Sequence, residues 1–287
     1  GKIRITDFSL LFIKYQGVCF MKKTLIALAV AASAAVSGTS MAAVGEWTPG
    51  GEGGSFEMGG TLVVTGASTS PWEVKVANAV SGLTGELKAG ETEATIGVLS
   101  KHASVLSIRT IAEKAFNGAN GITPQIDYGK AVDLDSFDAG LTKLTLNVYN
   151  DASQKIGVMK ADFFAGAIYS MNDRGYKGAY SLMASEAGQA FYGGVAKSKG
   201  GSLGYNSLVN KMMEIDQAAV EHFDLQNAPV SEIVDTGSFK TPFATYSGAY
   251  TSAIPYGEAS IKITLDKPMG NENVDWHASL PITVTYA

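Results

Sequence analysis

The sequence predicts a mainly β fold that carries a helix-containing insertion, and three patterns support this prediction. Residues 280–287 alternate strictly between apolar side chains on one face and polar or small side chains on the other, as in a half-buried strand. Residues 56–64 alternate in the same way near the start of the expected mature chain. Two segments with helical character lie between groups of strand-like segments, which indicates a subdomain inserted into a β scaffold.

The two alternating segments suggest a relationship between molecules. An amphipathic strand at the end of a chain presents unpaired main-chain groups along an edge that must be covered. We expect the earlier alternating segment to cover it in a neighbouring copy and so complete that copy's fold. The inward-facing residues of the donor strand are Phe56, Met58, Gly60, Leu62 and Val64. The residues expected to form the groove edge are Leu280, Ile282, Val284 and Tyr286.

Residues 21–42 have the three parts of a secretory signal peptide. Lys22 and Lys23 form the basic start, residues 24–36 form an apolar run, and residues 40–42 form a small-residue cleavage site. The apolar run is too short to span a bilayer. We expect residues 1–20 to be an upstream leader outside the fold, and cleavage after Ala42 or else after Ala43. The alternative interpretation of residues 21–42 is an N-terminal core helix.

The composition of the mature chain argues against several classes of function. Removing residues 1–42 lowers the number of Lys and Arg from 22 to 17 and that of Asp and Glu from 27 to 26, so the product is acidic. An acidic surface disfavours nucleic acid and anionic membranes as partners. The single cysteine, Cys19, lies in the leader, so the mature chain has neither a disulfide nor a thiol nucleophile.

Seven further segments are predicted to be strands from their alternation or their β-rich composition. Turn-forming residues at 150–153 join two of them into a hairpin. The seven segments are residues 72–76, 104–108, 122–126, 141–149, 156–164, 243–254 and 258–265.

Residues 180–192 and 207–223 are predicted to be helices, and a loop is expected at residues 197–204. Gly193 and Gly194 would provide the C-cap of the first helix. In the second helix, apolar residues recur at steps of three and four, and Asp216 interrupts the apolar stripe.

Signals for catalysis or metal binding are weak. Residues 200–204 match the G-x-S-x-G pattern of serine hydrolases around Ser202, but that motif needs a buried strand before it, and a solvated loop precedes it here. A hydrolase is therefore a remote alternative. His102, His222 and His277 are far apart and lack the spacing of metal ligands. We expect no catalytic residue, no metal, no cofactor and no enzymatic activity.

Short motifs in the signal peptide and, in order, along the mature chain resemble chaperone–usher fimbrial subunits. More narrowly, they resemble the kappa-clade major subunits of FaeG-like and ClpG-like adhesive fimbriae of enteric bacteria. The longest are MKKTLIAL at residues 21–28 and GSFEMGGTL at residues 54–62, together with the penultimate Tyr286. Shorter ones are WEVKV at 72–76, KAF at 114–116, PQI at 124–126, AFYGG at 190–194 and WHA at 276–278.

The resemblance implies an incomplete immunoglobulin-like sandwich of the pilin type, completed by a donor strand and carrying an inserted α/β subdomain. A periplasmic chaperone would lend a strand during export, and at an outer-membrane usher the arm of the next identical subunit would replace it. The expected parts are a donor-strand arm at 43–64, sandwich strands at 65–165 and 241–287, and the insertion at 166–240. The expected destination is a surface fimbrium that attaches to host-cell glycans.

Exposed tyrosines in loops suit contact with a glycan, because they offer sugar rings an apolar face and a hydroxyl group. The alternative for each tyrosine is packing in the core or at a sheet edge. The candidate receptor-binding residues are Asn172, Arg174, Tyr176 and Tyr205. An alternative function is that of a monomeric secreted carbohydrate-binding module. In that case the N-terminal strand would pair within its own chain.

Overall fold

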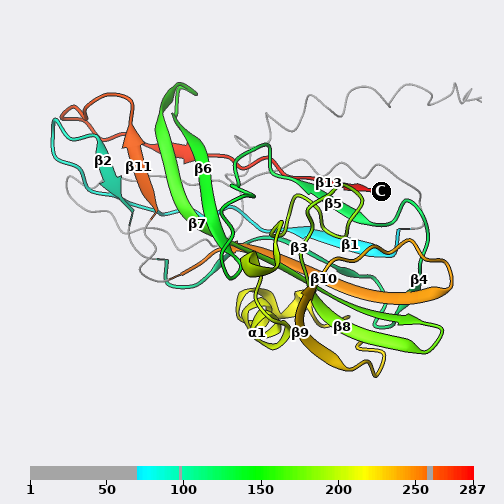
Figure 1. Cartoon of the computed structure of the whole chain (residues 1–287). Helices are drawn as coiled ribbons and strands as arrows, with labels where there is room; N and C mark the ends of the chain where they lie inside the picture. Colours follow the sequence, from blue (N-terminus) through cyan, green and yellow to red (C-terminus); the bar gives the residue numbers. More distant parts are fainter. Residues whose placement is uncertain (1–69, 97–98, 257–260) are drawn as a thin grey trace, which may run out of the picture. The chain divides into compact units, whose positions relative to one another are not determined.

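The fold consists mainly of antiparallel β-strands, with an α-helix packed on one face (Figure 1). The computed structural model describes residues 70–96, 99–256 and 261–287. Within these ranges, no helix has the length and apolar character needed to cross a bilayer. Outside them lie the expected leader, signal peptide and arm, with the donor-strand residues Phe56, Met58, Gly60, Leu62 and Val64.

Strand β7 (Lys155–Asp173) runs through the larger sheet and divides it into two halves. The first half of β7 pairs with β6 (Leu141–Asn150) on one side and with β11 (Lys262–Leu265) on the other. This half of the sheet continues beyond β6 to β12 (Trp276–Ala278) and beyond β11 to β2 (Glu93–Thr95). Figure 1 shows β6 and β7 as a long hairpin.

The second half of β7 pairs with β8 (Tyr176–Leu182) on one side and with β10 (Ala244–Ile254) on the other. Beyond β8 lies β9 (Val230–Asp235), which pairs with it in parallel. Beyond β10 lies β3 (Ala103–Thr110), and β1 (Trp72–Val76) pairs with β3 at the margin of the sheet.

A smaller sheet consists of β5 (Pro124–Asp127) and β13 (Thr283–Tyr286), while the short β4 (Phe116–Asn117) pairs with β10. Apolar side chains from both sheets share one core, as expected for an immunoglobulin-like sandwich. The inward face predicted for the last segment is confirmed. Leu280, Ile282 and Val284 are at most 2% exposed, and Tyr286 is partly buried against the core.

Strands with one solvated face were predicted well. β6 alternates regularly between exposed and buried residues, because one of its faces packs on the core. β7 is longer than predicted and also runs through the expected boundary between residues 165 and 166. Residues 163–170 of β7 are buried on both faces, so they lack the alternation that reveals a half-buried strand.

The helix predicted at residues 180–192 is wrong. Residues up to Leu182 belong to β8, held between β7 and β9, and the loop that follows has no α-helix. Sheet pairing here outweighs local helical propensity. Gly193 is therefore not a C-cap. Its φ is +81°, and a β-carbon at this position would overlap the carbonyl oxygen of Ile126 on β5.

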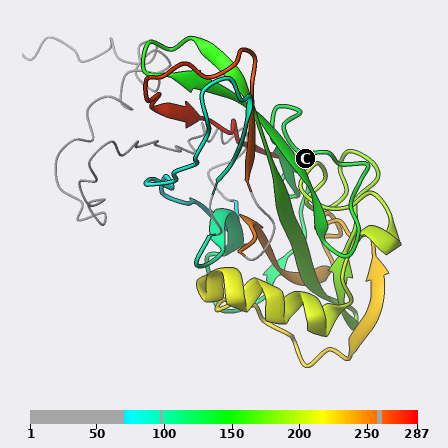
Figure 2. The ribbon, with the colours of Figure 1, turned by 90° about the vertical axis from the view of Figure 1, so that its left-hand side faces the viewer.

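The second predicted helix is confirmed in part. Helix α1 (Tyr205–Asp216) is followed by the 3₁₀-helix η3 (Gln217–Ala219) instead of continuing to residue 223. Its buried side chains Leu208 and Met212 belong to a second apolar cluster with Ile168 and Ala249, on the face of β7 and β10 opposite the main core. Figure 2 shows α1 lying across the sheet.

Candidate functional site

Within the described part of the chain, strand β13 has one open edge. Ala287 and Thr123 exchange main-chain hydrogen bonds of 3.0 and 3.2 Å, and in an antiparallel ladder such bonded pairs alternate along the strand. The main-chain groups of Val284 and Tyr286 therefore point away from β5. Ile126, opposite Val284, likewise donates its N–H to Tyr192. No strand in the described ranges pairs with this edge of β13.

Strand β1 also has an unpaired edge within the part of the chain that the structure describes, since it pairs there with β3 alone. Val74 and Val76 on its inner face are only partly buried. The start of β1 lies near the end of β13, where the Tyr286 side chain hydrogen-bonds to Ser70 and burial raises the pKa of the Tyr286 hydroxyl. Two open strand edges thus meet at one end of the core.

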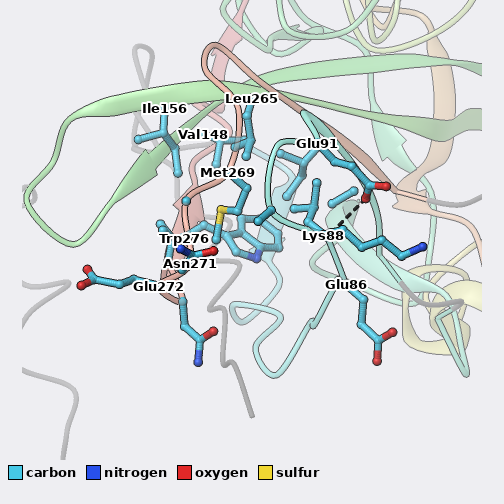
Figure 3. Close-up of a pocket in the computed structure, with 18 of the residues that line it drawn as sticks. Glu86, Lys88, Glu91, Val148, Ile156, Leu265, Met269, Asn271, Glu272 and Trp276 are labelled. Carbon is cyan, nitrogen blue, oxygen red and sulfur yellow. Dashed lines mark hydrogen bonds between the residues drawn. The ribbon is translucent and has the colours of Figure 1, made fainter. Parts of the chain in front are cut away.

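A cavity of about 600 Å³ opens between the segment that follows β1 and the segment that precedes β13 (Figure 3). Its floor includes Val148 of β6, Leu265 of β11 and Trp276 of β12, and its walls are residues 85–91 and 269–274. Figure 3 shows Met269 beside Trp276 inside the cavity, with Glu86 and Glu272 pointing outward at the rim. The floor is apolar, whereas the rim carries three glutamates and one lysine: Glu86, Glu91, Glu272 and Lys88.

We call the two open edges and this cavity together the groove. Residues 72–96 border one side and residues 269–286 border the other. Between the two ends, two further apolar side chains, Val80 and Leu83, pack on the core but remain only partly buried. The groove therefore offers main-chain hydrogen-bonding groups along its edge and apolar surface along its floor. These are the features that an added β-strand requires.

Three of the candidate receptor residues lie together in the hairpin between β7 and β8. They are Asn172, Arg174 and Tyr176. The Arg174 guanidinium lies 5.8 Å from the centroid of the Phe243 ring, and Phe243 and Tyr176 are 75% and 68% exposed. Sequence analysis missed Phe243 because it directly precedes a strand and was taken as part of it.

The fourth candidate, Tyr205, was expected in an exposed loop, and this expectation is wrong. It is the first residue of α1, is 7% exposed and packs on Phe223. Burial raises the pKa of its hydroxyl to about 12. A helix start that also contributes to an apolar cluster cannot be distinguished from a loop by composition alone.

The region around Ser202 lacks the structure of a hydrolase nucleophile. A 3₁₀-helix (Lys199–Gly201) precedes Ser202 where a buried strand is needed, and the Ser202 hydroxyl donates to the Leu203 carbonyl at 3.3 Å. Among the described residues, no group of three or more His, Cys, Asp or Glu side chains is placed to hold a metal ion.

This chain is similar to known fimbrial proteins along nearly its whole length. The family described as "Fimbrial, major and minor subunit" matches residues 21–287. K88 fimbrial proteins AB and AD of Escherichia coli are 29% and 30% identical to this chain, and each alignment covers 93% of this chain and all of the relative. The F41 fimbrial protein of Escherichia coli is 25% identical over the same shares of the two chains.

Proposed function

Because this chain belongs to the family of major and minor fimbrial subunits, we propose that its copies polymerise by exchanging strands. In this proposal, the arm of one copy (residues 43–64) occupies the groove of the next. The contact is head-to-tail and does not close on itself, so it builds a filament. The observation that carries the proposal is the open edge of β13 beside an apolar floor.

The arm matches the groove in length and in pattern. Nine residues from Phe56 to Val64 span about 27 Å as a strand. The border from Trp276 to Tyr286 spans at most about 33 Å, because residues 279–282 lie outside the strands. Alternate apolar side chains of the arm would enter the floor, and its main chain would bond to Val284 and Tyr286. Gly60 would allow close backbone approach in the middle of the strand.

Charge favours one direction for the docked arm. The cavity rim carries Glu86, Glu91 and Glu272 against the single Lys88, so acidic side chains outnumber basic ones there. The arm carries its acids toward its start, the last of them at Glu57, and residues 58–64 have no charge. Repulsion is therefore smallest when Val64 lies at the cavity and Phe56 lies near Tyr286, so that the arm runs antiparallel to β13.

The resemblance to chaperone–usher subunits implies two further partners that would act on the same groove. Before assembly, the open strand edges and the partly buried apolar side chains beside them would be accessible and prone to aggregation. A periplasmic chaperone that lends a strand would protect it, and an outer-membrane usher would exchange that strand for the arm of the next subunit. The product is a cell-surface fimbrium.

Adhesion is a second proposed role, supported by the exposed side chains of Arg174, Tyr176 and Phe243 at one end of the sheet. Aromatic faces beside a guanidinium and an amide suit the stacking and hydrogen bonding that sugar rings require. We propose that this end, the hairpin surface, attaches to host-cell glycans.

Peptide rescue tests strand exchange. A mature chain without residues 43–64 would receive a labelled peptide of residues 54–66, and binding would be followed by fluorescence anisotropy. We expect the wild-type peptide to bind and its Thr61→Asp variant to bind with only a small loss, because residue 61 faces outward and its charge stays in water. The Leu62→Asp peptide would fail, since it places a charge on the apolar floor. The proposal would be contradicted if the two variant peptides bound equally well, or if neither of them bound.

A further inference from the structure

Asp216 lies where a carboxylate is unfavourable. It is the last residue of α1, where the helix dipole places partial negative charge, and its side chain is only 12% exposed. Burying a charge is costly unless it is paired. Asp216 meets this requirement with two partners, since the Ser107 hydroxyl donates to its Oδ2 at 2.6 Å and the Lys75 Nζ lies 2.7 Å from the same oxygen.

Both partners belong to the strands at the margin of the larger sheet. Lys75 of β1 and Ser107 of β3 are directly opposite each other in the ladder. Two residues earlier on β1, Glu73 is opposite Arg109, which donates to Glu73 at 2.6 Å and to the Ala218 carbonyl at 2.7 Å. Both outward-facing residues of β1 are therefore tied, directly or through β3, to the chain at the end of α1.

The inner face of the same strand borders the groove. Val74 and Val76 alternate with Glu73 and Lys75, and they contribute partly buried apolar surface to the groove. In the described part of the chain, β1 has ladder bonds on the β3 side only. Contacts on its outer face therefore influence where its inner face and its open edge lie.

We propose that Asp216 and Lys75 are a positioning pair, which holds β1 where its open edge can accept the incoming strand. This inference rests on the proposed strand exchange. It gives the inserted helix a role in assembly, because α1 then supports the border of the groove from the opposite face of the sheet. The simpler explanation is a surface ion pair that adds little stability and does not affect the arm.

Hydrogen exchange in intact fimbriae, followed by mass spectrometry of peptides, tests the pair. Three variants are needed: Asp216→Asn, Lys75→Met and the charge exchange K75D/D216K. Lys197→Met is the matched control, because it removes another lysine–aspartate contact of 2.6 Å, made with Asp135 in a different part of the surface. Hydrogen-exchange rates are compared in the peptides that cover β1 and the arm.

We expect either single substitution to speed exchange in β1 and in arm residues 56–64 by about two- to fivefold, with β6 unchanged. The double variant K75D/D216K, in which the two charges are swapped, should restore slow hydrogen exchange. Lys197→Met should have no effect on hydrogen exchange in β1 or the arm. Unchanged exchange in β1 and the arm, or equal acceleration in β6, would overturn the positioning role. An unprotected arm in wild-type fimbriae would instead show that strand exchange itself is wrong.

Discussion

The indole N–H of Trp72 donates a 2.6 Å hydrogen bond to the carbonyl oxygen of Ile122. This bond joins the first described strand, β1, to the segment that leads into β5 and so connects the two sheets across the core. The Trp72 ring also contacts Phe116, Phe191 and Phe239, with centroid separations of 5.1, 5.7 and 4.8 Å. One border of the groove is thus tied to β5, the strand that pairs with β13 on the other border.

Replacing Trp72 with Phe should lower the free energy of unfolding by about 1–3 kcal/mol, because the buried Ile122 carbonyl would lose its partner. Urea unfolding of the mature chain measures this loss. Phe243→Leu serves as the control, since Phe243 is exposed and should change stability by less than about 0.5 kcal/mol. Equal stabilities for Trp72→Phe and wild type would show that the hydrogen bond contributes nothing.

Substitution of Gly193 should be much more harmful than substitution of Gly200. A β-carbon on Gly193 meets the Ile126 carbonyl, and the residue has a positive φ, whereas Gly200 has open space around it. We expect Gly193→Ala to cost at least about 2 kcal/mol and to distort β5, which carries β13. Thermal unfolding of both alanine variants provides the comparison. Equal melting temperatures would contradict this interpretation of Gly193.

His102 should make the fold sensitive to mild acid. Its side chain is 7% exposed, and its Nδ1 accepts the Tyr256 N–H at 3.2 Å. Burial, and then the charge of Lys211, lower its pKa, although Glu214 opposes this effect. Because the folded pKa lies below the unfolded value of about 6.5, acid protonates the unfolded chain first. Stability is therefore full above pH 6.5 and falls as the pH drops toward the folded pKa.

A His102→Gln variant removes this titration and can still accept the Tyr256 N–H. Its unfolding free energy should fall less than that of wild type between pH 7 and pH 5, as measured by urea unfolding at several pH values. Glu214 stays ionised through this window, because a hydrogen bond from Lys211 lowers its pKa. Parallel pH profiles for the two proteins would exclude His102 as the source.

The hairpin surface should determine glycan attachment. Tyr176→Ala and Phe243→Ala should each weaken binding on a glycan array by about tenfold, because each removes an exposed ring that can stack on a sugar. Tyr256→Ala is the matched control, since Tyr256 is also exposed but lies elsewhere in the chain. Fimbriae of all three variants should form normally. Undiminished binding by both hairpin variants would exclude this surface as the receptor site.

Sequence patterns predicted the half-buried strands because one face of each meets water. β6 and the last strand alternate clearly, and their inward residues, including Leu146 and Val284, are buried as expected. The second half of β7 was missed because α1 covers one face and the core covers the other. The false helix at 180–192 arose because pairing between distant strands leaves no local signal there.

The groove was predicted only in part. The apolar face of residues 280–286 gave one border, but the cavity beside Trp276 depends on residues 85–91 and 269–274, which are far apart in the sequence and have no strand pattern. The contact between Lys75 and Asp216 was also invisible, although Asp216 stood out as a polar interruption in an apolar stripe. A residue that breaks a local pattern can indicate a tertiary partner.

Gel electrophoresis of heat-released fimbriae, unboiled and boiled in detergent, tests strand exchange between subunits most directly. We predict a ladder of multimers that collapses on boiling, both for wild type and for Thr61→Asp, and loss of the ladder for Leu62→Asp. A ladder that Leu62→Asp leaves intact would contradict the role of the arm. A single monomer band in the unboiled wild-type lane would contradict strand exchange and favour a module that completes its own fold.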